Sequence, residues 1–205
     1  QMLDSPENNF CTLNPLTPAD DNPWSQHSAS KTYSEGNLKA AKATHAAYKG
    51  TFGMTSGKWY WEVFHEQTNQ NIGIIAANHT GGGTNEYSYN DASAYGFYPW
   101  DDQKIIGGTW QGSDTFGGDA TAGPNATTDQ TIMIAYDADN DKMWIGINGD
   151  WNKAHGRDSG RDPDNGIHPD FEPSTTYKPY VAWVHSASTS QENNTTFNFG
   201  QGDKD

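Results

Sequence analysis

Aromatic side chains set among short polar ones are the residues of this sequence best suited to binding chemistry. Tyr87 and Tyr89 alternate with polar residues between Glu86 and Asp91, and Trp100 is followed by two aspartates. Trp151 lies near an expected turn. Such rings can stack on a sugar face while polar neighbours bond its hydroxyls, and they serve equally well as hot spots of protein interfaces. The same rings could instead pack the edge of an aromatic-rich core, so both interpretations stay open.

Regularly spaced carboxylates suggest a second chemistry, calcium binding. Asp137, Asp139 and Asp141 resemble the first half of a calcium loop, although Lys142 stands where such loops carry Gly and no Glu stands at the twelfth position. A second acidic loop contains Asp158, Asp162, Asp164 and Asp170. We weigh Ca²⁺ at either loop against a plain hairpin turn and a polar surface loop, and we expect no other cofactor.

Catalytic signals are weak. Glycosidases hold two carboxyl groups across the sugar, about 5–9 Å apart, but the aspartate run falls at a turn, and only one of Glu62 and Glu66 falls on an expected strand. No G-x-S-x-G elbow occurs, and the seven histidines lack zinc-site spacing. Cys11 is better explained as a small buried hydrophobe than as a nucleophile. The sequence therefore favours a protein that is not an enzyme.

Charge and composition exclude several partners. The 205 residues carry 12 Lys and Arg against 26 Asp and Glu, a net charge of −14. This balance argues against nucleic acid and against anionic membranes, since both are bound through basic residues. No stretch approaches the roughly 18 apolar residues of a membrane span, so we expect no membrane insertion.

The elements that must position these residues are strands. Residues 58–64 put Trp59, Trp61 and Val63 on one face and Lys58 and Tyr60 on the other, which is the alternation of a half-buried strand. Similar strands are expected at 71–76, 94–98, 104–108, 131–136, 142–148, 180–185 and 196–199. Gly- and Asn-rich turns separate them, which predicts an all-β, antiparallel two-sheet β-sandwich with little helix. The proline-rich residues 1–30 are expected to form an extended arm packed on a sandwich of residues 31–205, one domain overall.

The order of these strand motifs resembles that of SPRY (B30.2-like) domains. The matching segments are 56–63 (SGKWYWEV), 71–74 (NIGI), 93–97 (SAYGF), the hairpin 131–149, 177–181 (YKPYV) and 197–200 (FNFG). Residues 9–16 and 33–38 resemble the lead-in of SPRY-type domains encoded by bacteriophages and aquatic viruses. The turn at 137–141 has Asp where the family often has Gly.

The resemblance implies a bent sandwich of the concanavalin A-like jelly-roll kind that binds partners through loops at one end. It directs attention to residues 86–91 and 185–188, and it adds His185 to the candidates. The predicted ligand-binding residues are therefore Glu86, Tyr87, Tyr89, Asp91, Trp100, Trp151 and His185.

Three functions follow as expectations. The viral-type flanks favour a virion surface or tail component, extracellular, that binds a host glycan or protein or assembles the particle with other virion proteins. An intracellular SPRY adaptor that binds a peptide is the first alternative. A glucanase-like sandwich enzyme is the second, and it would require an inward-facing pair of carboxylates in a groove.

Overall fold

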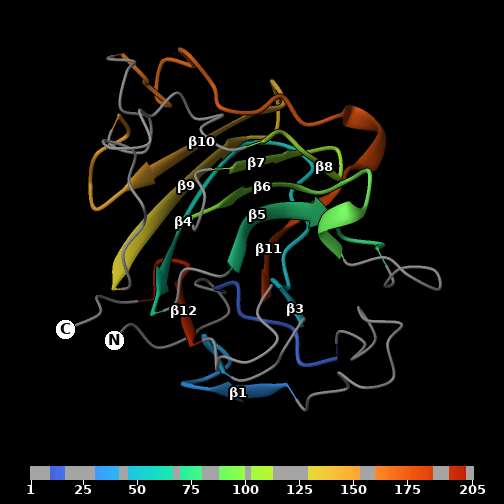
Figure 1. The fold of residues 1–205 in the computed structure, drawn as a ribbon, viewed down its shortest axis with the longest axis vertical. Helices are drawn as coiled ribbons and strands as arrows, with labels where there is room; N and C mark the ends of the chain where they lie inside the picture. Colours follow the sequence, from blue (N-terminus) through green and yellow to red (C-terminus); the bar gives the residue numbers. More distant parts are fainter. Residues whose placement is uncertain are drawn as a thin grey trace.

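The computed structural model describes residues 10–16, 31–41, 46–66, 70–79, 88–99, 103–112, 129–152, 160–186 and 194–201. They form two six-stranded antiparallel sheets that face each other as the layers of a sandwich (Figure 1). The predicted all-β sandwich is confirmed. The described helical turns are two short 3₁₀ helices, η1 (Ser88–Asn90) and η3 (Thr175–Tyr177). No described helix has the length and apolar character that crossing a bilayer would require.

The first sheet has the order β1-β2-β12-β4-β9-β10. Its strands are β1 (Thr32–Ser34), β2 (Lys39–Ala41), β12 (Thr195–Asn198), β4 (Lys58–His65), β9 (Gln130–Asp137) and β10 (Lys142–Ile147). The second sheet has the order β3-β11-β5-β6-β7-β8. Its strands are β3 (Ala47–Lys49), β11 (Tyr180–Ser186), β5 (Gln70–Ala76), β6 (Tyr95–Tyr98), β7 (Gln103–Ile106) and β8 (Thr109–Trp110).

The core between the sheets follows the alternation of the strands. Trp61 and Val63 of β4 point inward beside Ile132 and Ile134 of β9, while Tyr60 points out. Isoleucine and aromatic side chains fill most of the interior, with Leu13 as its leucine among the described residues. The outer face of the first sheet is therefore the polar face of its strands, as expected for an antiparallel layer with one solvated side.

The centre of the second sheet is buried on both faces. All seven residues of β5 are buried, and a separate cluster lies on the outer side of this sheet, around Trp183 and Ile75. Tyr89 and Trp110 pack against that cluster from neighbouring segments. The two sheets therefore present different outer faces, one open and one covered.

Residues 10–16 lie against the sandwich. Leu13 is fully buried, pairs with Gly50 in an isolated bridge, and donates its N–H to the Asn37 carbonyl at 2.8 Å. The Gln201 side chain donates to the carbonyl of Cys11, which joins this segment to the residues after β12. The remainder of the predicted arm lies outside the described residues, and the boundary at residue 30 stays a prediction.

Candidate ligand-binding site

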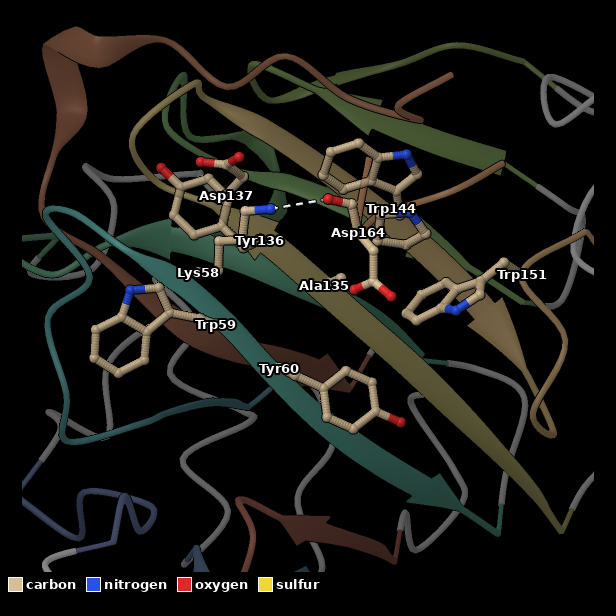
Figure 2. A pocket seen from close by; sticks show the side chains of 10 residues that line it. Lys58, Trp59, Tyr60, Ala135, Tyr136, Asp137, Trp144, Trp151 and Asp164 are labelled. Carbon is tan, nitrogen blue, oxygen red and sulfur yellow. Dashed lines mark hydrogen bonds between the residues drawn. The ribbon is translucent and has the colours of Figure 1, made fainter. Parts of the chain in front are cut away.

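A hollow of about 200 Å³ opens on the outer face of the first sheet (Figure 2). The strand register sets Tyr60 of β4, Ala135 of β9 and Trp144 of β10 side by side in one row. Ala135 has only a methyl group, so the space between the two flanking rings is left unfilled. Small residues between large ones on a sheet face are one way in which a sequence makes a depression.

Trp151 closes one side of this hollow. Its ring packs edge-to-face with Tyr60, with ring centroids 6.2 Å apart and planes at 72°. Gly146 lies beneath it, and a Cβ on this glycine would stand 2.8 Å from Cε3 of the indole. Tyr60 is 51% exposed. We define the Tyr60–Trp151 hollow as this depression with its two rings.

The opposite wall is the loop 160–170. Lys58 of β4 donates to the Asp164 carbonyl at 3.0 Å, and the Trp144 indole N–H donates to the Ile167 carbonyl at 2.8 Å. Figure 2 shows the Asp164 carboxylate directed toward the space between Ala135 and Trp151. An exposed carboxylate therefore faces two aromatic rings.

Asp170 fixes this loop to the sheet. Its carboxylate is fully buried and accepts bonds from the Ile145 backbone N–H at 2.8 Å and from Arg161 Nε at 2.9 Å. The Lys104 ammonium lies 4.0 Å from the same carboxylate. These contacts tie the wall of the hollow to β10 and β7, and removing one partner of the buried ion pair would leave the other charge unpaired.

The hydroxyl of Tyr60 is also engaged. It donates to Glu62 Oε1 at 2.7 Å, and partial burial together with this bond raises the pKa of Tyr60 above its ordinary value. Glu62 Oε2 accepts a further bond from the Asn198 side chain at 3.0 Å. The ring of Tyr60 is therefore neutral and held in place, as a platform for stacking requires.

A second aromatic group lies on the outer side of the second sheet. The rings of Tyr89 and His185 meet edge-to-face at 4.8 Å, and Tyr89 contacts Trp110 at 5.4 Å. Trp183 lies beside His185 and donates its indole N–H to the Ser88 hydroxyl of η1 at 3.2 Å. We define the Trp183 cluster as Trp183, His185, Tyr89 and Trp110. The structure thus brings together Tyr89 and His185, two of the predicted residues, but His185 and Trp183 are fully buried.

Asp91, another predicted residue, anchors the segment that covers this cluster. It lies 3.0 Å from His79 Nδ1 and accepts the Ser93 N–H at 2.8 Å. The bond to His79 is the largest of the causes that hold the pKa of Asp91 well below its ordinary value. Lys49 donates to the His79 carbonyl at 2.6 Å and ties the pair to β3. The described bonds of Asp91 are therefore structural.

Comparison with known proteins identifies the architecture. No family model and no curated protein matches the sequence. Among solved structures, the chain is similar to the SPRY domain of human HERC1, with a TM-score of 0.61 over 93% of this chain and 99% of that one. The chain has the SPRY fold. The sequences are 12% identical, so this likeness shows the fold alone, and a viral kind of SPRY domain stays a prediction.

The structure describes four of the predicted ligand residues, Tyr89, Asp91, Trp151 and His185. Of these four, Trp151 alone lies at the Tyr60–Trp151 hollow. Glu86, Tyr87 and Trp100 lie outside the described residues. Sequence reasoning missed Tyr60 as a site residue and considered Asp164 for calcium alone. The signal for Tyr60 was available, because a large aromatic on the polar side of an alternating strand has no core to fill. The acidic loop marked Asp164 only as a candidate for calcium, because its position beside the two rings depends on how the loop folds back.

The aspartates considered for calcium serve separate purposes in the SPRY fold. Asp137 accepts bonds from the backbone N–H groups of Asp139 and Asn140, each at 3.0 Å. Asp139 accepts the Gly57 N–H at 3.0 Å, and Asp141 pairs with the Lys178 ammonium at 2.6 Å. Within the described ranges, no three His, Cys, Asp or Glu side chains gather as a metal site would require. The geometry favours the hairpin turn over calcium at this loop.

The carboxylates considered for catalysis are likewise engaged. Glu62 holds Tyr60 and Asn198, as described above. Glu66 accepts a bond from the Asn194 side chain at 2.9 Å and lies 3.6 Å from the Lys39 ammonium. Neither glutamate is among the residues that line the Tyr60–Trp151 hollow.

Proposed function

We propose that this chain is a non-catalytic recognition module that binds a host glycan in the Tyr60–Trp151 hollow. The observation that carries the proposal is the crossed pair of rings, one of them half exposed, above a floor made by Ala135. Two rings at a steep angle offer one face for stacking and one edge for lateral contact. A sugar ring, with an apolar face and polar rim, is a ligand of that shape.

The polar groups at the rim suit hydroxyl ligands. The Asp164 carboxylate can accept bonds from sugar hydroxyls, and the Lys58 ammonium is exposed beside it. Because the carboxylates of Asp137 and Asp164 outnumber the single ammonium of Lys58 in its lining, the hollow disfavours an anionic ligand. A peptide bound through an aromatic side chain would use the same rings and is the competing outcome of the test below.

We place this activity on a virion surface or tail. Support comes from residues 9–16 and 33–38, whose sequence resembles the lead-in of phage and aquatic-virus SPRY domains. The net charge of −14 suits an extracellular module, since salt screens repulsion between exposed charges. Assembly of the particle with other virion proteins is the variant of this proposal that needs no glycan.

Binding of the purified chain to a broad glycan array and to host cells tests the proposal. We expect the Trp151→Ala variant to lose binding and Trp110→Ala, a half-buried tryptophan of the other sheet, to retain it. Loss in Trp110→Ala and Tyr89→Ala with retention in Trp151→Ala would move the site to the Trp183 cluster. No binding by the folded wild type would overturn the glycan proposal and leave peptide binding or assembly.

A further inference from the structure

The Asp164 carboxylate at the rim of the Tyr60–Trp151 hollow has no partner among the described residues. Its oxygens accept no hydrogen bond and join no ion pair there, and the bond from Lys58 goes to the Asp164 backbone carbonyl at 3.0 Å instead. The neighbouring Asp162 carboxylate, by contrast, accepts a bond from the Asn165 side chain at 2.6 Å. Because the Asp164 carboxylate is exposed and directed toward the space beside Trp151, it is available to a ligand of the hollow (Figure 2).

The lysines on the strands beneath the hollow, Lys58 and Lys142, are already engaged. Lys58 of β4 lies directly opposite Asp137 of β9 in the strand register, a position in which opposite charges attract. Lys142 of β10 lies on the other side of Asp137, donates to the Gly166 carbonyl at 3.1 Å, and does not line the hollow. Since Asp137 offsets the charge of Lys58, the charge of Asp164 is left unbalanced in the lining.

A cation in the hollow would be attracted by two kinds of group. The rings of Tyr60 and Trp151 line the same space as the Asp164 carboxylate. An aromatic ring attracts a cation that lies over its face, and a carboxylate forms a charge-assisted hydrogen bond with an ammonium group. A hydroxyl group in the same place offers only a dipole to the rings and to the carboxylate, so it would be held less tightly.

We infer that the glycan bound in the Tyr60–Trp151 hollow carries a free ammonium group, as an amino sugar does when it is not N-acetylated. The sugar ring lies against the two aromatic rings, and its ammonium group donates to the Asp164 carboxylate. The volume of about 200 Å³ suits a single six-membered ring, since a cavity of roughly 150 Å³ accommodates benzene. The net charge of −14 favours the approach of a cation. This inference rests on the proposed function and specifies the ligand of the same site.

Three pairs of monosaccharides test the inference: glucosamine with glucose, galactosamine with galactose, and mannosamine with mannose. The members of a pair share one ring and differ in the ammonium group that replaces a hydroxyl. NMR titrations at slightly acid pH, where the amine is protonated, follow the indole N–H signal of Trp151, assigned by its absence in Trp151→Ala. We expect at least one amino sugar to bind the wild-type chain about three- to thirtyfold more tightly than its hydroxyl partner, the factor that one exposed ion pair and one cation–π contact contribute. The N-acetylated form, which is neutral, should lose this preference.

The Asp164→Asn variant should lose the preference for the amino sugar and retain the affinity for its hydroxyl partner. Asp129→Asn is the matched control, because it changes the net charge equally at an exposed position next to the end of β4 that is remote from Tyr60. Asparagine tolerates the positive φ of 68° at this position. The control should keep the preference. An unchanged preference in Asp164→Asn, or its loss in Asp129→Asn, would overturn the inference.

Ethanolamine, an ammonium compound without a sugar ring, separates a sugar site from a simple cation site. It should leave the Trp151 signal unshifted at concentrations that saturate the chain with the amino sugar, and equal binding of the two would overturn the inference. A wild-type chain that binds array glycans but prefers no amino sugar in any pair would overturn this inference alone. A folded chain that binds neither the array nor any of these sugars would overturn the proposed glycan function as well.

Discussion

The outer faces of the two sheets both carry aromatic side chains, yet only one leaves them open. At the Tyr60–Trp151 hollow the Tyr60 ring is half exposed and meets Trp151 edge-to-face. In the Trp183 cluster, η1 is bonded to the indole of Trp183, and His185 beside it is fully buried. An aromatic residue near a turn is therefore no indication of function until the position of the neighbouring segment is known.

Glycines support the rings on both faces. Gly96 lies in the same row as Trp183, and a Cβ there would stand 3.1 Å from Cζ3 of the indole. Gly146 has the same relation to Trp151, at 2.8 Å. The bare backbone lets each indole lie close to its sheet. Because one indole is in the interior and the other is at the surface, equivalent substitutions should have different consequences on the two sheets.

The largest difference is expected from removing each indole. Trp183→Ala should cost about 3–5 kcal/mol of unfolding free energy, because it empties a fully buried site. Trp151→Ala should cost about 1 kcal/mol or less, as surface changes do, while abolishing ligand binding. Urea unfolding of both variants measures this. Similar losses in both would mean that the Tyr60–Trp151 hollow is part of the structural core.

A smaller difference is expected from filling the space beneath each ring. Gly96→Ala would press against the Ile72 carbonyl and Trp183, which cannot yield, so we expect a loss of about 1–3 kcal/mol. Gly146→Ala should instead displace the half-buried Trp151 ring and weaken ligand binding more than it weakens the fold. Unfolding and binding measured on both variants test this pair. An unchanged affinity in Gly146→Ala would remove Trp151 from the site.

The anchor of the Trp183 cluster should respond to acid. A carboxyl whose pKa is lowered in the folded state contributes stability above its ordinary value of 3.8, and that contribution is lost as the pH falls through the folded pKa. The wild-type chain should therefore have a larger free energy of unfolding than Asp91→Asn at pH 7, and the difference between the two free energies should become smaller below pH 4. Urea midpoints of the two proteins from pH 7 to pH 2 provide the measurement. A gap that stays constant down to pH 2 would show that the charge of Asp91 does not matter.

Much of this fold could be predicted from period-2 alternation. The eight strands expected from residue 58 onward coincide with β4 to β7 and β9 to β12 within two residues at each end. The four missed strands, β1, β2, β3 and β8, have three residues or fewer, too short to show a period. Their positions depend on partners far along the chain, such as β11 for β3.

The candidate site was less predictable, for a physical reason. Tyr89 and His185 could be expected to meet, since both flank strands of one sheet, but their burial depends on how η1 packs. Trp151 and Tyr60 are 91 positions apart and meet through strand register, and Asp164 arrives on a loop held by Asp170. Local patterns identify which residues face outward, but the loops that cover or frame them are set by long-range contacts.

The smallest expected effect is that of calcium on the rim of the Tyr60–Trp151 hollow, where Asp137 contributes to the lining. Burial raises the pKa of Asp137, but hydrogen bonds from Asn140 and from the Asp139 N–H lower it more, so the net pKa lies below its ordinary value. Both carboxylate oxygens of Asp137 therefore already accept bonds within the turn. A calcium site filled to a hundred times its Kd would add about 2.7 kcal/mol, and in a chain of this length that raises the Tm by several degrees. We expect millimolar calcium to leave the Tm unchanged in thermal unfolding, with EDTA-treated protein as the reference. A rise of several degrees that Asp137→Asn abolishes would establish a metal at this loop, and the hollow would then accept ligands through calcium as well as through its rings.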